Sequence, residues 1–218
     1  MSEMARMDEG VLSRLLSRYT DLQSCEVQIE YAFQLLRDTF RTGHKLLVCG
    51  NGGSAADSEH IVGELMKGFL RPRSIPDAVQ AMLIETCGED GRYLAHHLQG
   101  GLPAISLVSQ FGLFTAFVND VAADMVFAQQ VYGYGQPGDV LWGISTSGNS
   151  PNVLYAAQIA RSLGLRTVGL TGADGGKLAN WCDVLIRVPY TMVPEVQERH
   201  LPIYHALCAA LELEFFSP

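Results

Sequence analysis

Five short apolar runs, separated by segments of helical pattern, constrain the fold of this chain more than any other feature. Each run is too short for a helix and lacks the polar alternation of a strand that has one face in water. Such runs are typical of a parallel sheet that helices cover on both faces. The sequence therefore predicts a single doubly wound α/β domain with a five-stranded parallel sheet, its strands at residues 45–49, 104–108, 139–144, 167–170 and 184–188.

Helical periodicity fills the intervals and both ends of the chain. Apolar residues over 11–40 recur at helical spacing, either as one helix or as two with a break near residues 20–24. Residues 1–43 are thus expected to be an N-terminal helical segment, and residues 44–218 the α/β domain, in one structural unit overall. The other expected helices lie at residues 54–65, 78–86, 90–98, 152–163 and about 194–215.

Charge and apolar patterning exclude several classes of protein. The 218 residues carry 15 Lys and Arg against 23 Asp and Glu, a net charge of −8, which disfavours a nucleic-acid partner. No apolar stretch reaches the ~20 residues that cross a bilayer, and no signal peptide is expected. Charged residues make up only 17%, against about 25% in a typical soluble protein, so we expect copies of the chain to cover part of its surface.

The cysteines indicate a reducing compartment. There are five, an odd number, and they are widely scattered without a CxxC pair. This spacing suggests neither a disulfide framework nor a zinc ribbon. We therefore expect a cytoplasmic protein.

The first of two candidate phosphate loops follows the run at residues 45–49. Its sequence, Gly50-Asn51-Gly52-Gly53-Ser54, leads into a helical segment, where glycines let backbone N–H groups converge on an anion. The loop also fits a loose dinucleotide pattern, but no strand ending in an acid follows about 20 residues later, and no GK[ST] is present. We expect no nucleotide cofactor, and for this loop alone a plain tight turn and a phosphate site both stay open.

The second loop, Ser145-Thr146-Ser147-Gly148-Asn149-Ser150, favours a phosphate site. It follows the run at residues 139–144, and Pro151 stands where a helix would begin. A helix cap needs one side-chain oxygen, whereas this loop carries four hydroxyls. Because open α/β sheets bind ligands at the carboxyl ends of their strands, the two loops together predict a pocket for a small phosphorylated molecule.

Several polar side chains could act on such a molecule. His60 and Glu64 stand four residues apart on one helix face, either as a surface pair or as part of the pocket. Gln197 and His205 lie on the otherwise apolar final helix. The pair Asn119-Asp120 follows an apolar segment and could meet a substrate hydroxyl.

Together these motifs resemble the sugar isomerase (SIS) family, and within it the bacterial phosphoheptose isomerases. The resemblance spans about residues 46–211. It implies a flavodoxin-like five-stranded parallel sheet and a homotetramer with active sites between subunits. It also implies conversion of sedoheptulose 7-phosphate to D-glycero-D-manno-heptose 7-phosphate for bacterial surface polysaccharide. The motifs that carry it are CGNGGSAAD…H…E, TAFVND, GDVLWGISTSGNSPNV, TVGLTGADGGKLA and VQERHLPIYH.

The resemblance also assigns residues. In members that hold zinc, its ligands match His60, Glu64, Gln197 and His205, a mixed donor set that zinc accepts. Gln197 and His205 would lie about 12 Å apart along a regular helix. One ion on both therefore needs a distortion near Pro202 or ligands from two subunits, and His200 is the reserve candidate. The implied substrate contacts are Asn51, Gly52, Gly53, Ser54, Asn119, Asp120, Ser145, Thr146, Ser147, Ser150 and Gln197.

We expect an aldose–ketose isomerase that works through an enediol, with Glu64 as the base and His205 as the acid–base partner at the substrate oxygens. Two alternatives stay open: a non-catalytic SIS protein of the replication-initiator-associating type, and an isomerase of another phosphorylated sugar. The full set of catalytic positions favours the enzyme. Residues 71–103 are longer than the corresponding family segment, so we expect them to reshape or cover the pocket.

Overall fold

The computed structural model describes residues 7–216 and contains a five-stranded, all-parallel sheet. The strand order β2-β1-β3-β4-β5 places the first strand inside the sheet, so the direction of winding reverses between β1 and β3. All five predicted runs form strands, which confirms the predicted doubly wound fold. The strands are β1 (Leu46–Gly50), β2 (Ala104–Ser106), β3 (Val140–Ile144), β4 (Arg166–Thr171) and β5 (Val184–Arg187).

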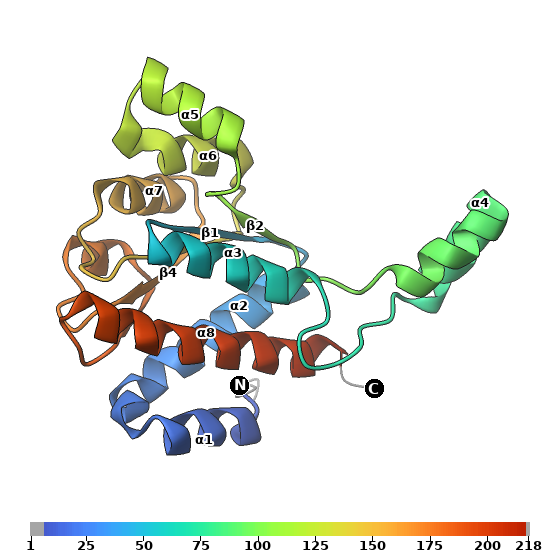
Figure 1. Ribbon diagram of the computed structural model, residues 1–218, viewed down its shortest axis with the longest axis horizontal. Coiled ribbons are helices and arrows are strands. Elements are labelled where there is room, and N and C mark those ends of the chain that lie inside the picture. The colour runs from blue at the N-terminus through green and yellow to red at the C-terminus, as the bar shows by residue number, and fades with distance from the viewer. Residues whose placement is uncertain (1–6, 217–218) are drawn as a thin grey trace.

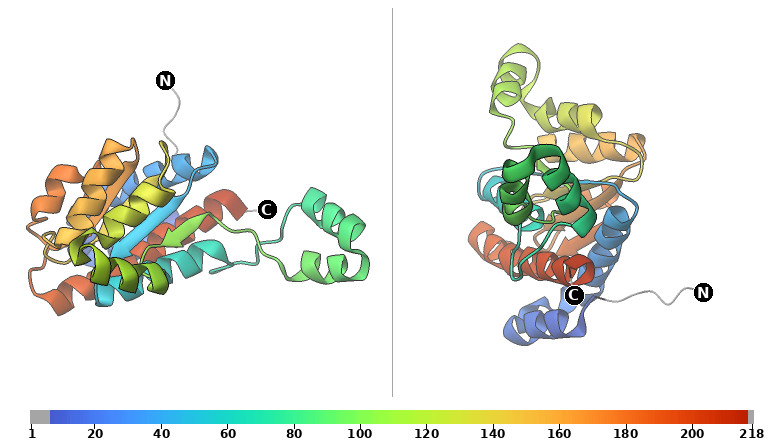
Figure 2. Two further views of the ribbon diagram at one scale, coloured as in Figure 1. Left: turned by 90° about the horizontal axis from the view of Figure 1, so that it is seen from above. Right: turned by 90° about the vertical axis from the view of Figure 1, so that its right-hand side faces the viewer.

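Helices cover both faces of the sheet (Figure 1 and Figure 2). Side chains alternate along each strand: Leu46 and Val48 of β1 enter the core on one face, and Leu47 and Cys49 enter the core on the other. The first core is covered by α1 (Glu9–Arg18), α2 (Glu26–Arg41), α3 (Gly53–Met66) and α8 (Val193–Phe216), and the second by α6 (Val126–Tyr134) and α7 (Pro151–Ser162).

The N-terminal segment consists of two helices, α1 and α2, joined by a short 3-10 helix at Thr20–Cys25. The sequence left open one long helix or two helices with a break, and the structure has two helices with a break. Leu15, Leu22 and Ile29 lie buried in the same core as α8. The segment is thus packed onto the α/β body, and the domain boundary at residue 43 stays a prediction.

Helix α4 (Asp77–His97) forms an arm that projects away from the rest of the molecule (Figure 1 and Figure 2). Gly88, with φ +58°, breaks it into two halves, close to the two helices expected at 78–86 and 90–98. A Cβ on Gly91 would collide with the carbonyl of Leu83, so glycine lets the halves pack closely. The arm extends away from its own chain's sheet, and the expectation that this segment reshapes or covers a pocket stays a prediction.

Two helices were not predicted: α5 (Phe111–Asp120) and α6, which are separated by a short 3-10 helix at Ala123–Met125. No residue of α5 is buried, although its sequence is mostly apolar. Another 3-10 helix lies at Lys177–Trp181. None of the helices in residues 7–216 has the length and apolar content needed to span a membrane.

Candidate active site

The two candidate phosphate loops lie side by side, because β1 and β3 are neighbours in the sheet and both run into helices. Asn51 in the first loop and Asn152 at the start of α7 exchange two hydrogen bonds. Asn51 Nδ2 donates to Asn152 Oδ1 at 2.9 Å, and Asn152 Nδ2 donates to Asn51 Oδ1 at 2.8 Å. The predicted meeting of the loops is therefore observed. Asn152, which we had not singled out, links them.

The hydroxyls of the second loop are arranged so that some protons stay available to an anion. Ser145 Oγ and Ser150 Oγ share one hydrogen bond of 2.9 Å. Ser147 Oγ accepts from the N–H of Asn149 at 3.2 Å, so its own proton is not used in that bond. Ser145 is buried, whereas Ser147 is exposed, and the loop thus offers hydroxyls at two depths. Such a loop can surround a phosphate without a lysine.

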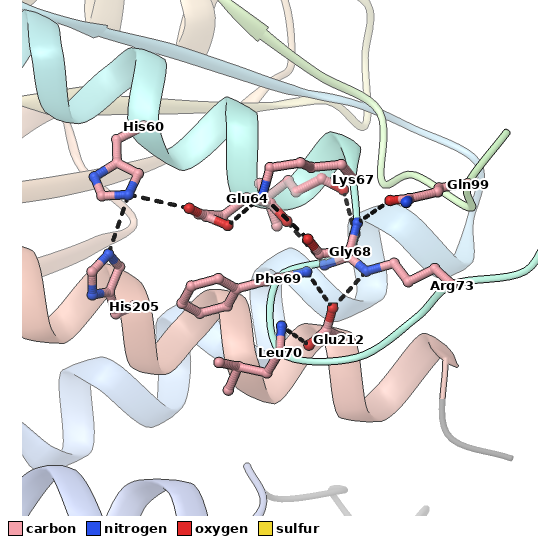
Figure 3. Close-up of polar contacts among 11 residues, drawn as sticks. His60, Glu64, Lys67, Gly68, Phe69, Leu70, Arg73, Gln99, His205 and Glu212 are labelled. Carbon is pink, nitrogen blue, oxygen red and sulfur yellow. Dashed lines mark hydrogen bonds and ion pairs between the residues drawn. The ribbon is translucent and has the colours of Figure 1, made fainter. Parts of the chain in front are cut away.

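The predicted histidine and glutamate side chains meet on the helix that follows the first loop, where α3 and α8 run side by side (Figure 3). His60 Nε2 lies 3.2 Å from Glu64 Oε1 and 3.4 Å from His205 Nε2. Burial and the neighbouring His60 lower the pKa of His205, while Glu64 opposes the shift. The structure therefore brings three of the four predicted ligands together.

Gln197 lies further along the same pair of helices. A Cβ on Gly53, the first residue of α3, would lie 2.5 Å from Gln197 Nε2, so this amide faces the first loop. Helix α8 runs through Pro202 as one continuous helix, and Gln197 stays about two turns before His205. This position suits a contact with a ligand in the loop, and the role of Gln197 as a metal ligand stays a prediction.

His200 occupies the protein interior, away from the cluster. It is fully buried, and among residues 7–216 neither ring nitrogen meets the geometry of a hydrogen bond. Burial lowers the pKa of His200 to about 4, and the backbone of Thr171 acts in the opposite sense. The contact with His60 is made by His205, so the structure favours His205 over the reserve candidate.

Asn119 and Asp120 lie at the exposed end of α5, where Asn119 Nδ2 donates to Asp120 Oδ1 at 2.7 Å. Figure 1 shows α5 at the outer edge of the molecule, beyond α6. Within one chain this helix stands apart from α3 and α8. The assignment of Asn119 and Asp120 to substrate binding stays a prediction.

Two functional candidates escaped the prediction, Asp57 and Tyr204. Tyr204 O–H donates to Asp57 Oδ1 at 3.1 Å and lies 3.0 Å from His60 Nδ1. Burial raises the pKa of Asp57, and both Tyr204 and His60 act against the rise. Asp57 is one turn before His60, and Tyr204 precedes His205. Only the packing of α3 on α8 reveals that they form one network.

A buried ion pair supports the end of α3 that carries Glu64 (Figure 3). Arg73 Nε donates to Glu212 Oε1 at 2.8 Å, and both side chains are almost wholly buried. The Arg73 guanidinium also donates to the carbonyls of Leu65, at 2.7 Å, and of Glu64, at 2.9 Å. Arg73 thereby satisfies the free carbonyls at the C-terminus of α3.

Two separations within the cluster of His60, Glu64 and His205 are those of neighbouring ligands on a tetrahedral metal ion. Donors that bind one zinc at about 2.0–2.1 Å lie about 3.3–3.4 Å apart, and the two separations here are 3.2 and 3.4 Å. Across residues 7–216, however, no three His, Cys, Asp or Glu side chains are placed so that they could hold a metal ion. The donor types are ones that zinc binds, and a zinc site here stays a prediction.

Comparison with known proteins shows to which family the chain belongs. The model of the SIS domain matches residues 11–85 and 80–172. The chain belongs to the SIS domain family. It is 40% identical over 191 residues to the phosphoheptose isomerase of Rhodospirillum rubrum, with 88% of each chain covered. It is 42% identical over 188 residues to that of Pelobacter propionicus, covering 86% of this chain and 85% of the relative.

Solved structures confirm the SIS fold. The phosphoheptose isomerase from Francisella tularensis superposes with a TM-score of 0.73 at 30% identity, covering 91% of this chain and 92% of the other. The enzyme from Neisseria gonorrhoeae gives a TM-score of 0.69 at 32% identity, covering 93% and 98%. The resemblance and the fold class predicted from the sequence are therefore both confirmed.

Proposed function

We propose that this SIS protein is an aldose–ketose isomerase that converts sedoheptulose 7-phosphate to D-glycero-D-manno-heptose 7-phosphate. The observation that carries the proposal is the cluster of His60, Glu64 and His205 on α3 and α8, because α3 begins at the first phosphate loop and Asn51 and Asn152 join that loop to the second. Relatives named phosphoheptose isomerase, at about 40% identity over most of the chain, support the choice of substrate. The product would serve the synthesis of surface-polysaccharide heptose.

Two residues of this chain share the proton transfers of the reaction. Glu64 takes the proton from C1 of the ketose and returns it to C2, which passes through a 1,2-enediol. His205 gives a proton to the oxygen on C2 and takes one from the oxygen on C1, so the protons balance.

The phosphate would be held by the second loop and by the N-termini of α3 and α7. The exposed hydroxyl of Ser147 and the Ser145–Ser150 pair supply donors, and the helix ends favour the negative charge. Gln197, which faces Gly53, would contact the sugar near the first loop. These contacts leave the far end of the sugar near Glu64 and His205.

We also propose a zinc ion on His60, Glu64 and His205, with the fourth ligand from Gln197, the substrate or a second subunit. When bound, zinc would polarise the carbonyl oxygen of the sugar as a Lewis acid. The donor set and the separations of 3.2 and 3.4 Å support this site.

We propose a homotetramer in the cytoplasm. The exposed apolar side chains of α5, which include Phe111 and Val118, and those of the α4 arm support burial against other subunits. Residues 1–43 are expected to contribute to the subunit interface, and the scattered cysteines support a reducing compartment. Sedimentation at micromolar concentration that shows only a 23.8 kDa species would contradict the assembly.

Incubation with sedoheptulose 7-phosphate in deuterated water tests the activity. We expect an aldose 7-phosphate product that carries deuterium at C2, because the proton on Glu64 exchanges with solvent during turnover. The same assay with other heptose, hexose and pentose phosphates defines the sugar. Tight binding of a sugar phosphate without any exchange would favour the non-catalytic SIS protein instead.

A further inference from the structure

Tyr204 occupies a position between two polar side chains of α3. Its hydroxyl lies 3.1 Å from Asp57 Oδ1 and 3.0 Å from His60 Nδ1. Tyr204 is 1% exposed, so the surrounding residues shield this hydroxyl from solvent. The three groups therefore form a short hydrogen-bonded chain that ends on one nitrogen of a proposed ligand.

The number of protons on these three groups fixes which group donates in each hydrogen bond. A tyrosine hydroxyl has one proton to give, and it donates that proton to the Asp57 carboxylate, which can only accept. The hydroxyl must then act as the acceptor toward His60, so the ring proton of His60 lies on Nδ1. A neutral imidazole carries one proton, and His60 Nε2 is left with a lone pair.

The lone pair of His60 Nε2 faces the proposed zinc site. Glu64 Oε1 is 3.2 Å from this atom and His205 Nε2 is 3.4 Å from it. Without Tyr204, the Glu64 carboxylate would itself attract the ring proton to Nε2, because that arrangement makes a hydrogen bond. Tyr204 and Glu64 thus compete for the ring proton of His60. Nε2 can bind a cation only when this proton lies on Nδ1.

We propose that Asp57 and Tyr204 are positioning residues that hold His60 with its proton on Nδ1, so that Nε2 is free for a metal ion. Metal-bound histidines usually give their second N–H to a carboxylate, a carbonyl or water. Here a tyrosine stands between the histidine and the carboxylate. The inference rests on the proposed function, since it concerns the same site, but its test does not depend on turnover.

Nitrogen-15 NMR of the histidine rings in the full chain reads the tautomer directly. The sample is stripped of metal by a chelator and held at alkaline pH, where the imidazoles are neutral. We expect His60 to show a protonated Nδ1 and an unprotonated Nε2. In Tyr204→Phe, the proton should move to Nε2 and donate to Glu64. A wild-type His60 with its proton on Nε2 would overturn the inference, even if Tyr204→Phe failed to fold.

Zinc affinity, measured by competition with a chelator, gives the second readout. Loss of an outer-shell partner typically weakens metal binding about 10–100-fold, and we expect this loss in Tyr204→Phe. Tyr190→Phe is the matched control, because Tyr190 also donates to a carboxylate, Asp21 Oδ2 at 2.9 Å, but far from His60. Equal zinc affinity in the wild type and Tyr204→Phe would overturn the proposal. If the wild type isomerised no sugar phosphate while His60 kept its proton on Nδ1, the proposed function would fail and this inference would stand.

Discussion

Asn51 and Asn152 lie 101 residues apart in the chain and bind each other through both ends of their amides, at 2.9 and 2.8 Å. Because each amide gives one proton and accepts one, the pair fixes the orientation of both side chains. It also joins the loop after β1 to the start of α7. The two loops therefore present their donors to a ligand as one surface.

Loss of the serine hydroxyls should weaken sugar-phosphate binding without unfolding the chain. Ser147→Ala combined with Ser150→Ala removes donors worth about 1 kcal/mol or more each, so affinity should fall about 30-fold. Ser150 makes no capping bond to α7, and the helix should persist. Titration calorimetry with the substrate checks this. Ser162→Ala, at the other end of α7, is the control, and an unchanged affinity in the double variant would make the loop a simple turn.

Glu64→Gln should separate chemistry from binding. The amide keeps the shape of the side chain and an oxygen for a metal, but it cannot act as the base. General acid–base groups contribute about 10²–10⁴-fold to the rate, and kcat should fall by that factor while phosphate affinity persists. Deuterium incorporation at substrate C2 gives the rate. Glu59→Gln, on the same helix and bound to Ser109, is the control. Full exchange activity in Glu64→Gln would assign the base to another residue.

His200 should make the folded state sensitive to mild acid. Its pKa is lowered from 6.5 to about 4, so below pH 6.5 the unfolded chain binds a proton that the folded chain does not. The free energy of unfolding therefore has its full value above pH 6.5 and falls by about 3 kcal/mol as the pH drops to 4.

His200→Leu should remove this pH dependence and keep the stability at neutral pH, since the buried ring nitrogens lack partners among the described residues. Urea unfolding across this pH range measures it, with His96→Gln on the exposed arm as the control. Loss of zinc binding in His200→Leu would restore His200 as the ligand.

Glu212→Gln should destabilise the protein strongly. Burial alone would raise the pKa of Glu212, but the N–H groups of Phe69 and Leu70 and the Arg73 guanidinium together lower it. The variant leaves Arg73 buried without its anion, which typically costs about 3–5 kcal/mol. Because the folded pKa is lowered, this stabilisation is present above about pH 4.5 and is lost as the pH falls through the lowered pKa.

Thermal unfolding of Glu212→Gln at neutral and acid pH measures both effects. Glu214→Gln is the matched control, because Glu214 lies on the same helix and its ion pair with Arg41 is partly exposed. Exposed pairs contribute about 0–1 kcal/mol. If the two variants unfolded at the same temperature, the buried pair would not be what secures the end of α3.

The sequence predicted the sheet well, because each buried strand is a short apolar run that turn residues bound on both sides. It did not predict α5, whose sequence Phe111–Asp120 is apolar around most of the helix. A helix without a polar face leaves no 3.6-residue period to detect. The two halves of α4 were predicted because Gly88 and Gly91 divide an irregular segment into two short helical stretches.

The candidate site was predicted only as far as local motifs reach. His60, Glu64 and the two loops stand out as short patterns, and the family resemblance added the roles of Gln197 and His205. The Asp57–Tyr204 bond joins residues 147 positions apart, and the Arg73–Glu212 pair joins residues 139 apart. Such contacts depend on how α3 and α8 pack, which no spacing within either helix records.

The α4 arm leaves the body and returns to it at almost one point. Ser74 and Gln99 form an antiparallel bridge, and the N–H of Gly100 donates to the carbonyl of Arg73 at 2.8 Å. The chain between them can therefore change in length without altering the distance from α3 to β2, and the entropy of closing such a loop grows only slowly with its length. Insertions and deletions within the arm should therefore leave the position of Glu64 unchanged, because the bridge and the buried Arg73 hold the end of α3 in place.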